Sequence, residues 1–313
     1  QHIELDIWLI SIILNKGISL ESNLYNYCYL FKFNSFIIYL YVGSGFMNLR
    51  ILSLGAGVQS SCLALMIEHG EIPMIDAAIF ADTMGEPADV YKWLEKLKTL
   101  ISFPLYIVSN GSLRKGLIQS NKGIYIRGTT IPLYTLNKVT GNKGILRRQC
   151  TVTFKIEPVK KQIRTLLGVQ KGQRVPKDKS IKQLFGISLD EMIRMRSSPD
   201  KYITFEYPLI DKRMTRNDCL KWMDKHKYPR PTKSACTFCP YHSNKSWLKL
   251  KENKTEWDDV VELDKTIRSG LLGTRDELYL HKSRVPLDKA ELEPDKDQLD
   301  LFDNVCDEGM CGV

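Results

Sequence analysis

Residues 53–61 combine glycines, serine hydroxyls and the start of a helical pattern, which are the components of a phosphate site. The segment reads Ser-Leu-Gly-Ala-Gly-Val-Gln-Ser-Ser. Glycines let the backbone approach a ligand closely, and the N–H groups at a helix start attract an anion. A Walker A loop is excluded because the Gly-Lys-Ser/Thr sequence is missing. A tight strand–helix turn is the alternative interpretation. The candidate phosphate-binding residues are Ser53, Gly55, Gly57, Ser60 and Ser61.

Asp82 and Thr83 follow the next apolar run of the chain. An acid at a strand end beside a phosphate loop can bind a ribose hydroxyl or a magnesium ion. The alternative is that Asp82 or Thr83 caps the helix that comes next. We therefore predict either a nucleotide contact with magnesium or a helix cap at this position.

Arg147 and Arg148 form a basic pair shortly before Cys150. The planar and permanently charged guanidinium group suits phosphate or sulfate. Such a run of charges usually forms a solvated basic face, but the presence of Cys150 within it favours a functional role. The stretch from Lys143 to Lys182 carries a net charge of +10, so it also favours a nucleic-acid partner.

Cys236 and Cys239 have the Cys-x-x-Cys spacing that brings two thiolates to one metal ion or cluster. Only two ligands are local, so the others have to come from elsewhere in the chain. Cys150 is the third candidate and His242 the fourth. An iron–sulfur cluster and a tetrahedral zinc ion fit this set equally well. Two reduced structural cysteines are the alternative.

Strand and helix patterns alternate from Met47 onward, which favours a parallel sheet covered on both faces. In such sheets, ligands bind beyond the carboxyl ends of the strands, where the candidate residues fall. The chain becomes helical from Tyr207. We expect strands at 49–54, 77–81, 104–108 and 184–187, a loop at 170–182, and helices at 60–69, 87–100, 113–119, 154–167, 190–195, 215–226, 245–252 and 257–267.

The composition of the 313 residues is globular, with 43% hydrophobic and 26% charged residues and a formal charge of +9. These values exclude a wholly disordered or collagen-like chain and favour an anionic partner. The apolar runs of residues 1–46 are too short to span a bilayer, and no secretory signal is evident. We expect a cytoplasmic protein without a membrane partner. The expected parts are an extension outside the fold at 1–46, a nucleotide-binding domain at 47–200, a helical metal-binding region at 201–285 and an acidic tail at 286–313.

Six segments in order between residues 47 and 245 resemble the phosphoadenosine phosphosulfate reductase family of the PP-loop superfamily. They are residues 53–61, 80–83, 150–158, 186–196, 207–218 and 236–239. The resemblance implies a Rossmann-like doubly wound parallel sheet of the HUP, or adenine nucleotide alpha hydrolase-like, type. It implies a bound adenine nucleotide, either ATP or an adenylyl sulfonucleotide. It also implies that Gly186, Glu191 and Arg194 take part in nucleotide binding.

Two departures from the family pattern matter. The PP-loop pattern Ser-Gly-Gly-x-Asp-Ser reads here Gly-Ala-Gly-Val-Gln-Ser. The missing first serine and aspartate disfavour ATP cleavage. The cluster-bearing reductases have a Cys-Cys pair where this chain has Gln149-Cys150. Three thiolates would leave one iron of a 4Fe-4S cluster open, which is similar to the tRNA-thiolating relatives.

The tail carries two further features. Reductases of this family use a cysteine near the C-terminus, which suggests Cys311 as the nucleophile here, with Cys306 as a partner. Arg147 and Arg148 would then bind the sulfonate, and a thioredoxin-like reductant would release sulfite. The segment Gln298–Phe302 resembles the pentapeptide that docks on the DNA sliding clamp, although packing of Leu301 and Phe302 on their own domain is the alternative.

Three functions follow from these patterns. The first is a sulfur-transfer enzyme resembling sulfonucleotide reductase. The second is an ATP-dependent enzyme that thiolates tRNA or DNA. The third is a non-catalytic nucleotide-binding protein, because a fold does not fix a function.

Overall fold

The computed structural model describes residues 28–33, 36–41, 47–124, 131–271, 274 and 276–293. The predicted tail cysteines Cys306 and Cys311 and the clamp-like segment Gln298–Phe302 lie outside these residues. The chain divides into two compact units, Gln1–Met47 and Asn48–Val313. In the first unit, strands β1 (Cys28–Phe33) and β2 (Phe36–Tyr41) pair antiparallel.

The second unit is built on a five-stranded sheet with the order β5-β4-β3-β8-β9. Three pairs, β3/β4, β4/β5 and β8/β9, are parallel. The chain moves outward from β3 through β4 to β5 and then returns to the other side of β3. The strand order therefore reverses between β3 and β8. The strands are β3 (Met47–Leu54), β4 (Ala77–Ala81), β5 (Leu105–Val108), β8 (Lys179–Phe185) and β9 (Ile203–Glu206).

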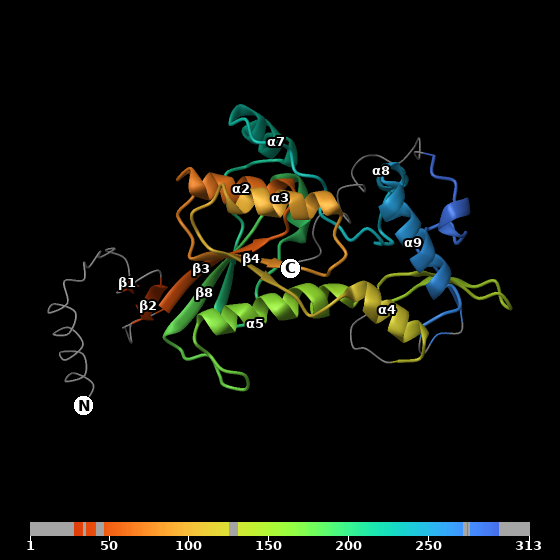
Figure 1. The fold of residues 1–313 in the computed structure, drawn as a ribbon, viewed down its shortest axis with the longest axis horizontal. Helices are drawn as coiled ribbons and strands as arrows, with labels where there is room; N and C mark the ends of the chain where they lie inside the picture. Colours follow the sequence, from red (N-terminus) through yellow and green to blue (C-terminus); the bar gives the residue numbers. More distant parts are fainter. Residues whose placement is uncertain are drawn as a thin grey trace. The chain divides into compact units, whose positions relative to one another are not determined.

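Helices lie on both faces of this sheet (Figure 1). Helices α2 (Val58–Glu68) and α3 (Ala88–Lys98) cover one face, and α5 (Glu157–Leu166) covers the other. Helix α7 (Arg216–Lys225) packs on α2. All five residues of β4 are buried, because a strand covered on both faces has to be apolar on both. The predicted alternation of strands and helices is confirmed, and the architecture is α/β with a mostly parallel, Rossmann-like sheet.

A second hydrophobic core lies among helices α4 (Leu113–Asn121), α8 (Asn244–Glu252) and α9 (Lys254–Ile267). Trp247, Val260 and Leu117 are fully buried in it. A small antiparallel sheet with the order β10-β6-β7 adjoins these helices. Its strands are β6 (Tyr134–Leu136), β7 (Lys143–Ile145) and β10 (Glu277–Tyr279). No helix among the described residues has both the length and the apolar character needed to cross a lipid bilayer.

Several sequence expectations about the elements were wrong. The predicted loop at 170–182 ends early because β8 begins at Lys179. The predicted helix at 154–167 is confirmed as α5 from Glu157 to Leu166, but its first residues belong to a π-helical turn, η1 (Val152–Ile156). The predicted helix at 190–195 is the 3₁₀ segment η2 (Leu189–Arg194). Strand β9 and the small sheet were not expected, because strands of three or four residues show too little periodicity. The remaining short elements are α6 (Pro208–Asp211) and η3 (Leu287–Lys289).

Candidate functional site

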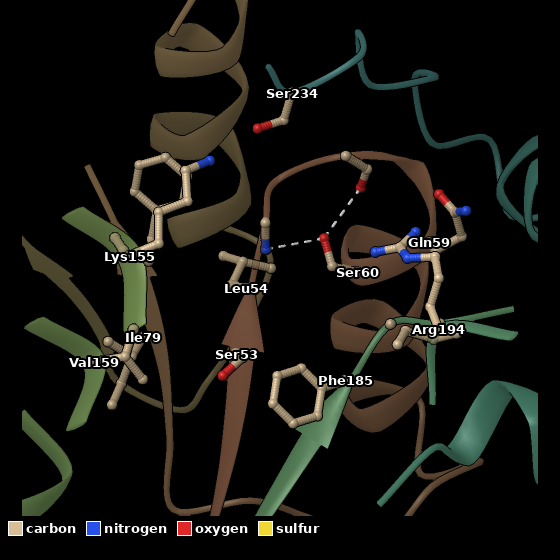
Figure 2. A pocket seen from close by; sticks show the side chains of 16 residues that line it. Ser53, Leu54, Gln59, Ser60, Ile79, Lys155, Val159, Phe185, Arg194 and Ser234 are labelled. Carbon is tan, nitrogen blue, oxygen red and sulfur yellow. Dashed lines mark hydrogen bonds between the residues drawn. The ribbon is translucent and has the colours of Figure 1, made fainter. Parts of the chain in front are cut away.

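A pocket opens where strands β3, β4 and β8 end (Figure 2). We call it the glycine-loop pocket. Its position at the reversal of strand order is where open parallel sheets bind ligands. Its lining is apolar along the strand ends and polar at the loop. The lining residues are Ser53, Leu54, Gly55, Gly57, Gln59, Ser60, Ile79, Phe80, Ala81, Lys155, Val159, Phe185, Gly186, Ile187, Arg194 and Ser234.

The loop between β3 and α2 is a sharp turn that presents a helix N-terminus to the pocket. Ala56 has a positive φ of 59°. Gly55 N donates to Ser60 Oγ at 3.2 Å, and Ser60 Oγ donates to Gly57 O at 3.4 Å. Gly57 is the N-cap of α2, and no side chain caps this helix. The first N–H groups of α2 are therefore left for an anion, and the helix dipole favours one.

Gly186 fixes the opposite wall of the pocket by close approach to the loop. A Cβ atom at Gly186 would lie 2.6 Å from both N and Cα of Ser60. Contacts this short to backbone atoms are forbidden, so only glycine lets the end of β8 lie against the start of α2. This approach explains structurally why Gly186 belongs to the candidate site.

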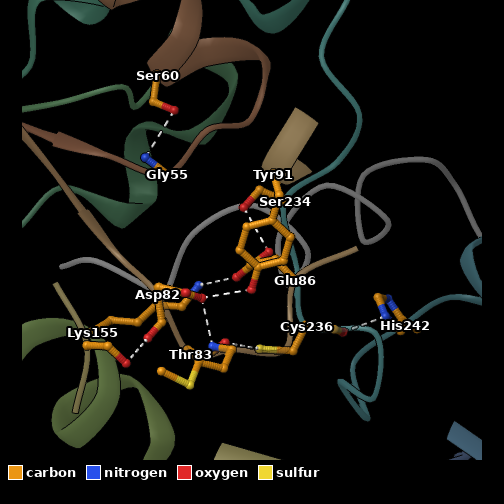
Figure 3. A network of polar contacts seen from close by, with 12 residues as sticks. Gly55, Ser60, Asp82, Thr83, Glu86, Tyr91, Lys155, Ser234, Cys236 and His242 are labelled. Carbon is orange, nitrogen blue, oxygen red and sulfur yellow. Dashed lines mark hydrogen bonds and ion pairs between the residues drawn. The ribbon is translucent and has the colours of Figure 1, made fainter. Parts of the chain in front are cut away.

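Two cations line the pocket on opposite sides of the loop (Figure 2). Lys155 Nζ pairs with Glu86 Oε1 at 3.2 Å, and Ser234 Oγ donates to Glu86 Oε2 at 3.1 Å (Figure 3). Arg194 Nη1 pairs with Glu191 Oε2 at 2.6 Å. Burial raises the pKa of Glu191, while the charge of Arg194 opposes that rise. All four charged side chains are buried.

The structure brings six of the ten predicted nucleotide-binding residues to the pocket. The other four lie nearby but do not line it. Ser61 Oγ accepts from the Trp93 indole at 2.8 Å, so it faces the core. The residues that line the pocket are Ser53, Gly55, Gly57, Ser60, Gly186 and Arg194, and those that do not are Ser61, Asp82, Thr83 and Glu191.

Asp82 and Thr83 have other partners. Asp82 Oδ1 accepts from Met84 N at 2.7 Å and from Tyr91 OH at 2.8 Å. Thr83 Oγ1 and Cys236 Sγ share a hydrogen bond of 3.1 Å. Asp82 thus orders the loop after β4, and Thr83 turns toward the cysteines (Figure 3).

Cys150, Cys236 and Cys239 line a second pocket, which we call the thiol pocket. Its walls are mostly apolar, and Lys155 lines it as well as the glycine-loop pocket. Arg148 also lines the thiol pocket, with its guanidinium 5.8 Å from the centre of the Tyr241 ring. Arg147 is exposed and lines neither pocket. The lining residues are Thr83, Leu113, Ile131, Pro132, Arg148, Cys150, Thr151, Lys155, Ala235, Cys236, Phe238, Cys239, Pro240 and Tyr241.

The Cys-x-x-Cys segment is attached to the loop after β4. Thr237 N donates to Gly85 O at 2.8 Å. A Cβ atom at Gly85 would lie 2.7 Å from Phe238 Cε1, so the glycine allows the Phe238 ring to pack there. Burial, and then the charge of Glu86, raise the pKa of the Cys236 thiol.

His242 does not line the thiol pocket. Its Nε2 is 2.9 Å from Cys236 O, and its ring packs edge-on against Trp247. Burial and the nearby Lys233 lower the pKa of His242 to about 4. Among the residues that the structure describes, no group of three or more His, Cys, Asp or Glu side chains is arranged to hold a metal ion. The predicted four-ligand set is therefore not assembled, although its three thiols share a pocket.

The sequence did not assign Lys155, Glu86 or Ser234 to the candidate site, although Lys155 and Glu86 lie in two of its recognised segments. Each lies within two to five residues of a recognised motif residue, namely Cys150, Asp82 and Cys236. Proximity to those motifs was the available signal, but the pairing of Lys155 with Glu86 spans 69 positions of sequence and leaves no local pattern.

No protein-family model and no curated protein matches the chain. Among solved structures, the chain is similar to phosphoadenylyl-sulfate (PAPS) reductase from Candida auris, solved as a phosphate complex. The two share 14% sequence identity with a TM-score of 0.35, and the match covers 58% of this chain and 74% of that chain.

Replacing Gly186 by alanine tests the close approach of β8 to the loop. We expect Gly186→Ala to lower the free energy of unfolding by about 1–3 kcal/mol, because its Cβ has to displace backbone. Denaturant unfolding followed by circular dichroism measures this loss. Gly55→Ala is the matched control, since its Cβ would meet only Ser60 Oγ, at 3.6 Å. Equal stability of the two variants would contradict the packing described.

Proposed function

We propose that the glycine-loop pocket binds an adenine nucleotide, with a phosphate at the N-terminus of α2. The observation that carries this proposal is the uncapped α2 terminus, which opens at the reversal of strand order beside Lys155 and Arg194. The apolar lining, including Leu54, Ile79 and Phe185, offers a surface for the faces of a nucleobase. Convergent polar groups in a largely apolar pocket are typical of cofactor and substrate sites.

We further propose that the chain is a sulfur-transfer enzyme resembling sulfonucleotide reductase. The thiol pocket supports this proposal, because Lys155 lines both it and the glycine-loop pocket. In this reaction the Cys311 thiolate attacks the sulfonate sulfur, the S–O bond to the nucleotide phosphate breaks, and the nucleoside phosphate leaves. A thioredoxin-like dithiol, or Cys306 followed by that reductant, then releases sulfite from the S-sulfocysteine and is oxidised to a disulfide.

A second candidate is a nucleic-acid modifying enzyme that thiolates tRNA or DNA. Arg148 and Tyr241 favour it, because they line the same pocket as the three thiols and because a cation and an aromatic ring suit a nucleobase. The basic stretch from Lys143 to Lys182 would bind the phosphate backbone, and Gln298–Phe302 would dock on a sliding clamp. Magnesium would accompany ATP in this case.

A metal centre in the thiol pocket is a separate proposal. Cys150, Cys236 and Cys239 would supply three thiolates to an iron–sulfur cluster or to zinc, and a cluster with one open iron would supply a site for an extra sulfur. His242 is not part of this set because it contacts the Cys236 carbonyl. Lys155 and Arg148 would partly balance the negative charge of the thiolates.

Substitution of the α2 N-cap tests the phosphate site without removing a structural contact. A Cβ at Gly57 would meet only Ser234 atoms at 4.0 Å, and aspartate is a favourable N-cap. We expect Gly57→Asp to fold normally and to weaken AMP binding about 100-fold, because the carboxylate occupies the helix N–H groups and repels phosphate. Calorimetric titration with AMP measures the effect. Gly57→Asn is the neutral control, expected to lose less, and unchanged AMP affinity in Gly57→Asp would exclude this phosphate site.

The sulfur-transfer activity is tested with the full chain, purified anaerobically. With thioredoxin and a reductant present, we expect sulfite from adenylyl sulfate or phosphoadenylyl sulfate, and no sulfite from Cys311→Ser. Cys62→Ala, which removes a buried core thiol outside both pockets, should retain activity. AMP and pyrophosphate released from ATP only with tRNA or DNA would instead favour the nucleic-acid modifying enzyme.

Metal analysis of the same preparation tests the thiol centre. We expect bound iron with sulfide, or zinc, in the wild-type chain, and its loss in Cys236→Ser and Cys239→Ser, because removing one of three thiolates weakens binding sharply. Cys62→Ala should keep the metal. A wild-type chain purified without either metal, and unable to take one up, would argue for reduced free cysteines.

A further inference from the structure

Gln59 lines the glycine-loop pocket, but both ends of its amide are bound to residues that do not line it. Gln59 Nε2 donates to Ser188 Oγ at 3.4 Å, and Gln59 Oε1 accepts from Arg216 Nη1 at 3.3 Å. Gln59 and Ser188 are both buried. The amide therefore connects three segments, namely the first turn of α2, the residue before η2 and the first residue of α7.

Arg216 is also attached to η2 through the main chain. Arg216 N donates to Asp190 Oδ1 at 3.0 Å, and two residues earlier Met214 O accepts from Leu189 N at 2.8 Å. Arg216 thus contacts α2 with its side chain and η2 with its backbone. A half-buried arginine that is bound to two elements is suited to fix the distance between them.

The segment η2 needs such contacts to keep its place in the fold. It has only six residues, and the backbone angles of Glu191 within it are not helical. Hydrogen-bond geometry is poorer in 3₁₀ segments than in α-helices, so internal bonds alone do not fix η2. Its outward side chains Met192 and Ile193 are 53% and 79% exposed and add little packing. The contacts of Ser188 with α2 and of Asp190 with α7 therefore help to fix this segment.

The position of η2 matters because this segment carries Arg194 into the pocket, on the same side of the loop as Gln59 (Figure 2). Arg194 is only 7% exposed, and its Nε has no hydrogen-bond partner among the described residues. A buried donor without a partner is costly, so an oxygen of an anionic ligand suits it. A shift of η2 would move this donor relative to the N-terminus of α2.

Resting on the nucleotide site proposed above, we infer that Arg216 is a positioning residue of the glycine-loop pocket. It does not touch the ligand. Arg216 holds the Gln59 amide, and the amide holds Ser188 at the start of η2. These contacts keep the Arg194 donor beside the N-terminus of α2, so that both bind the same phosphate.

Arg216 carries a charge as well as a hydrogen bond, and the two effects are separable. Burial raises the pKa of Glu191. The charges of Arg194 and Arg216 oppose this rise, and that of Asp190 adds to it. Burial lowers the pKa of Arg216, against the charges of Glu191 and Asp190. Helix α6 also packs on η2, but its exposed Asp211 is not among the charges that act on Glu191.

Loss of Arg216 weakens anion binding through charge whether or not residue 59 has an amide, whereas positioning needs the amide. A double-variant cycle in the full chain therefore separates the two, with AMP affinity measured by titration calorimetry. We expect Arg216→Met to weaken AMP binding about tenfold in the wild-type background. When Gln59→Met is already present, the further loss should be less than about twofold.

Two single variants complete the comparison. Arg216→Lys keeps a cation and a donor, so it should retain most of the affinity. Lys225→Met removes an exposed cation from the other end of α7 and should bind AMP as tightly as the wild-type chain. Denaturant unfolding checks that each variant is folded, and Arg216→Gln or Gln59→Leu replaces a methionine variant that is not.

Equal losses in both backgrounds would show that only the charge of Arg216 acts. Unchanged affinity in folded Arg216→Met would show a purely structural role, and complete loss of binding in Gln59→Met would show that the amide itself holds the ligand. Each of these results overturns the inference and leaves the nucleotide site intact. A wild-type chain that does not bind AMP would overturn the nucleotide site, and the inference with it.

Discussion

The buried ion pair between Lys155 and Glu86 is the contact on which both pockets depend. Glu86 lies in the loop after β4, and Lys155 lies in the π-helical turn before α5. Ser234, just before the Cys-x-x-Cys segment, donates to the same carboxylate. A buried pair of this kind adds little net stability over an apolar substitute. Its main effect is on position. It holds together the loop after β4, the π-helical turn before α5 and the segment before Cys236, and it places Lys155 in the lining of both pockets.

Two glycines allow the close packing contacts around these pockets. Gly186 lets the end of β8 lie against Ser60, and Gly85 lets the loop after β4 accept the ring of Phe238. The first contact closes one side of the glycine-loop pocket, and the second attaches the cysteine segment to the loop after β4. Phe238 is fully buried in the second hydrophobic core, so the cysteine segment connects that core to the loops at the carboxyl edge of the sheet.

The sequence predicted the sheet well where apolar runs are long enough to be buried, as in β3 and β4. The sequence also located the glycine loop, because glycines that precede a helical pattern are typical of a turn where the backbone approaches a ligand closely. It could not show that Lys155 points inward, because that direction depends on a π turn rather than the expected α-helix. Nor could it show that His242 turns to the Cys236 carbonyl, since spacing alone is compatible with a ligand. The strands of the small sheet have only three residues each, which is too short for a readable alternation of apolar and polar side chains.

The reversal of strand order also determines when the pocket can exist during synthesis. Ser53 and Gln183 contact one another at 2.7 Å across 130 positions of sequence, and Gly186 follows shortly afterwards. A nascent chain that has only completed β3, β4 and β5 has the glycine loop but no opposite wall. Closing this segment costs conformational entropy, and strand pairing between residues far apart in the sequence is slow. Until β8 has paired with β3, the edge of β3 and the start of α2 are not covered by β8. During the time between the synthesis of β3 and that of β8, these surfaces of the growing chain are therefore exposed to other partners.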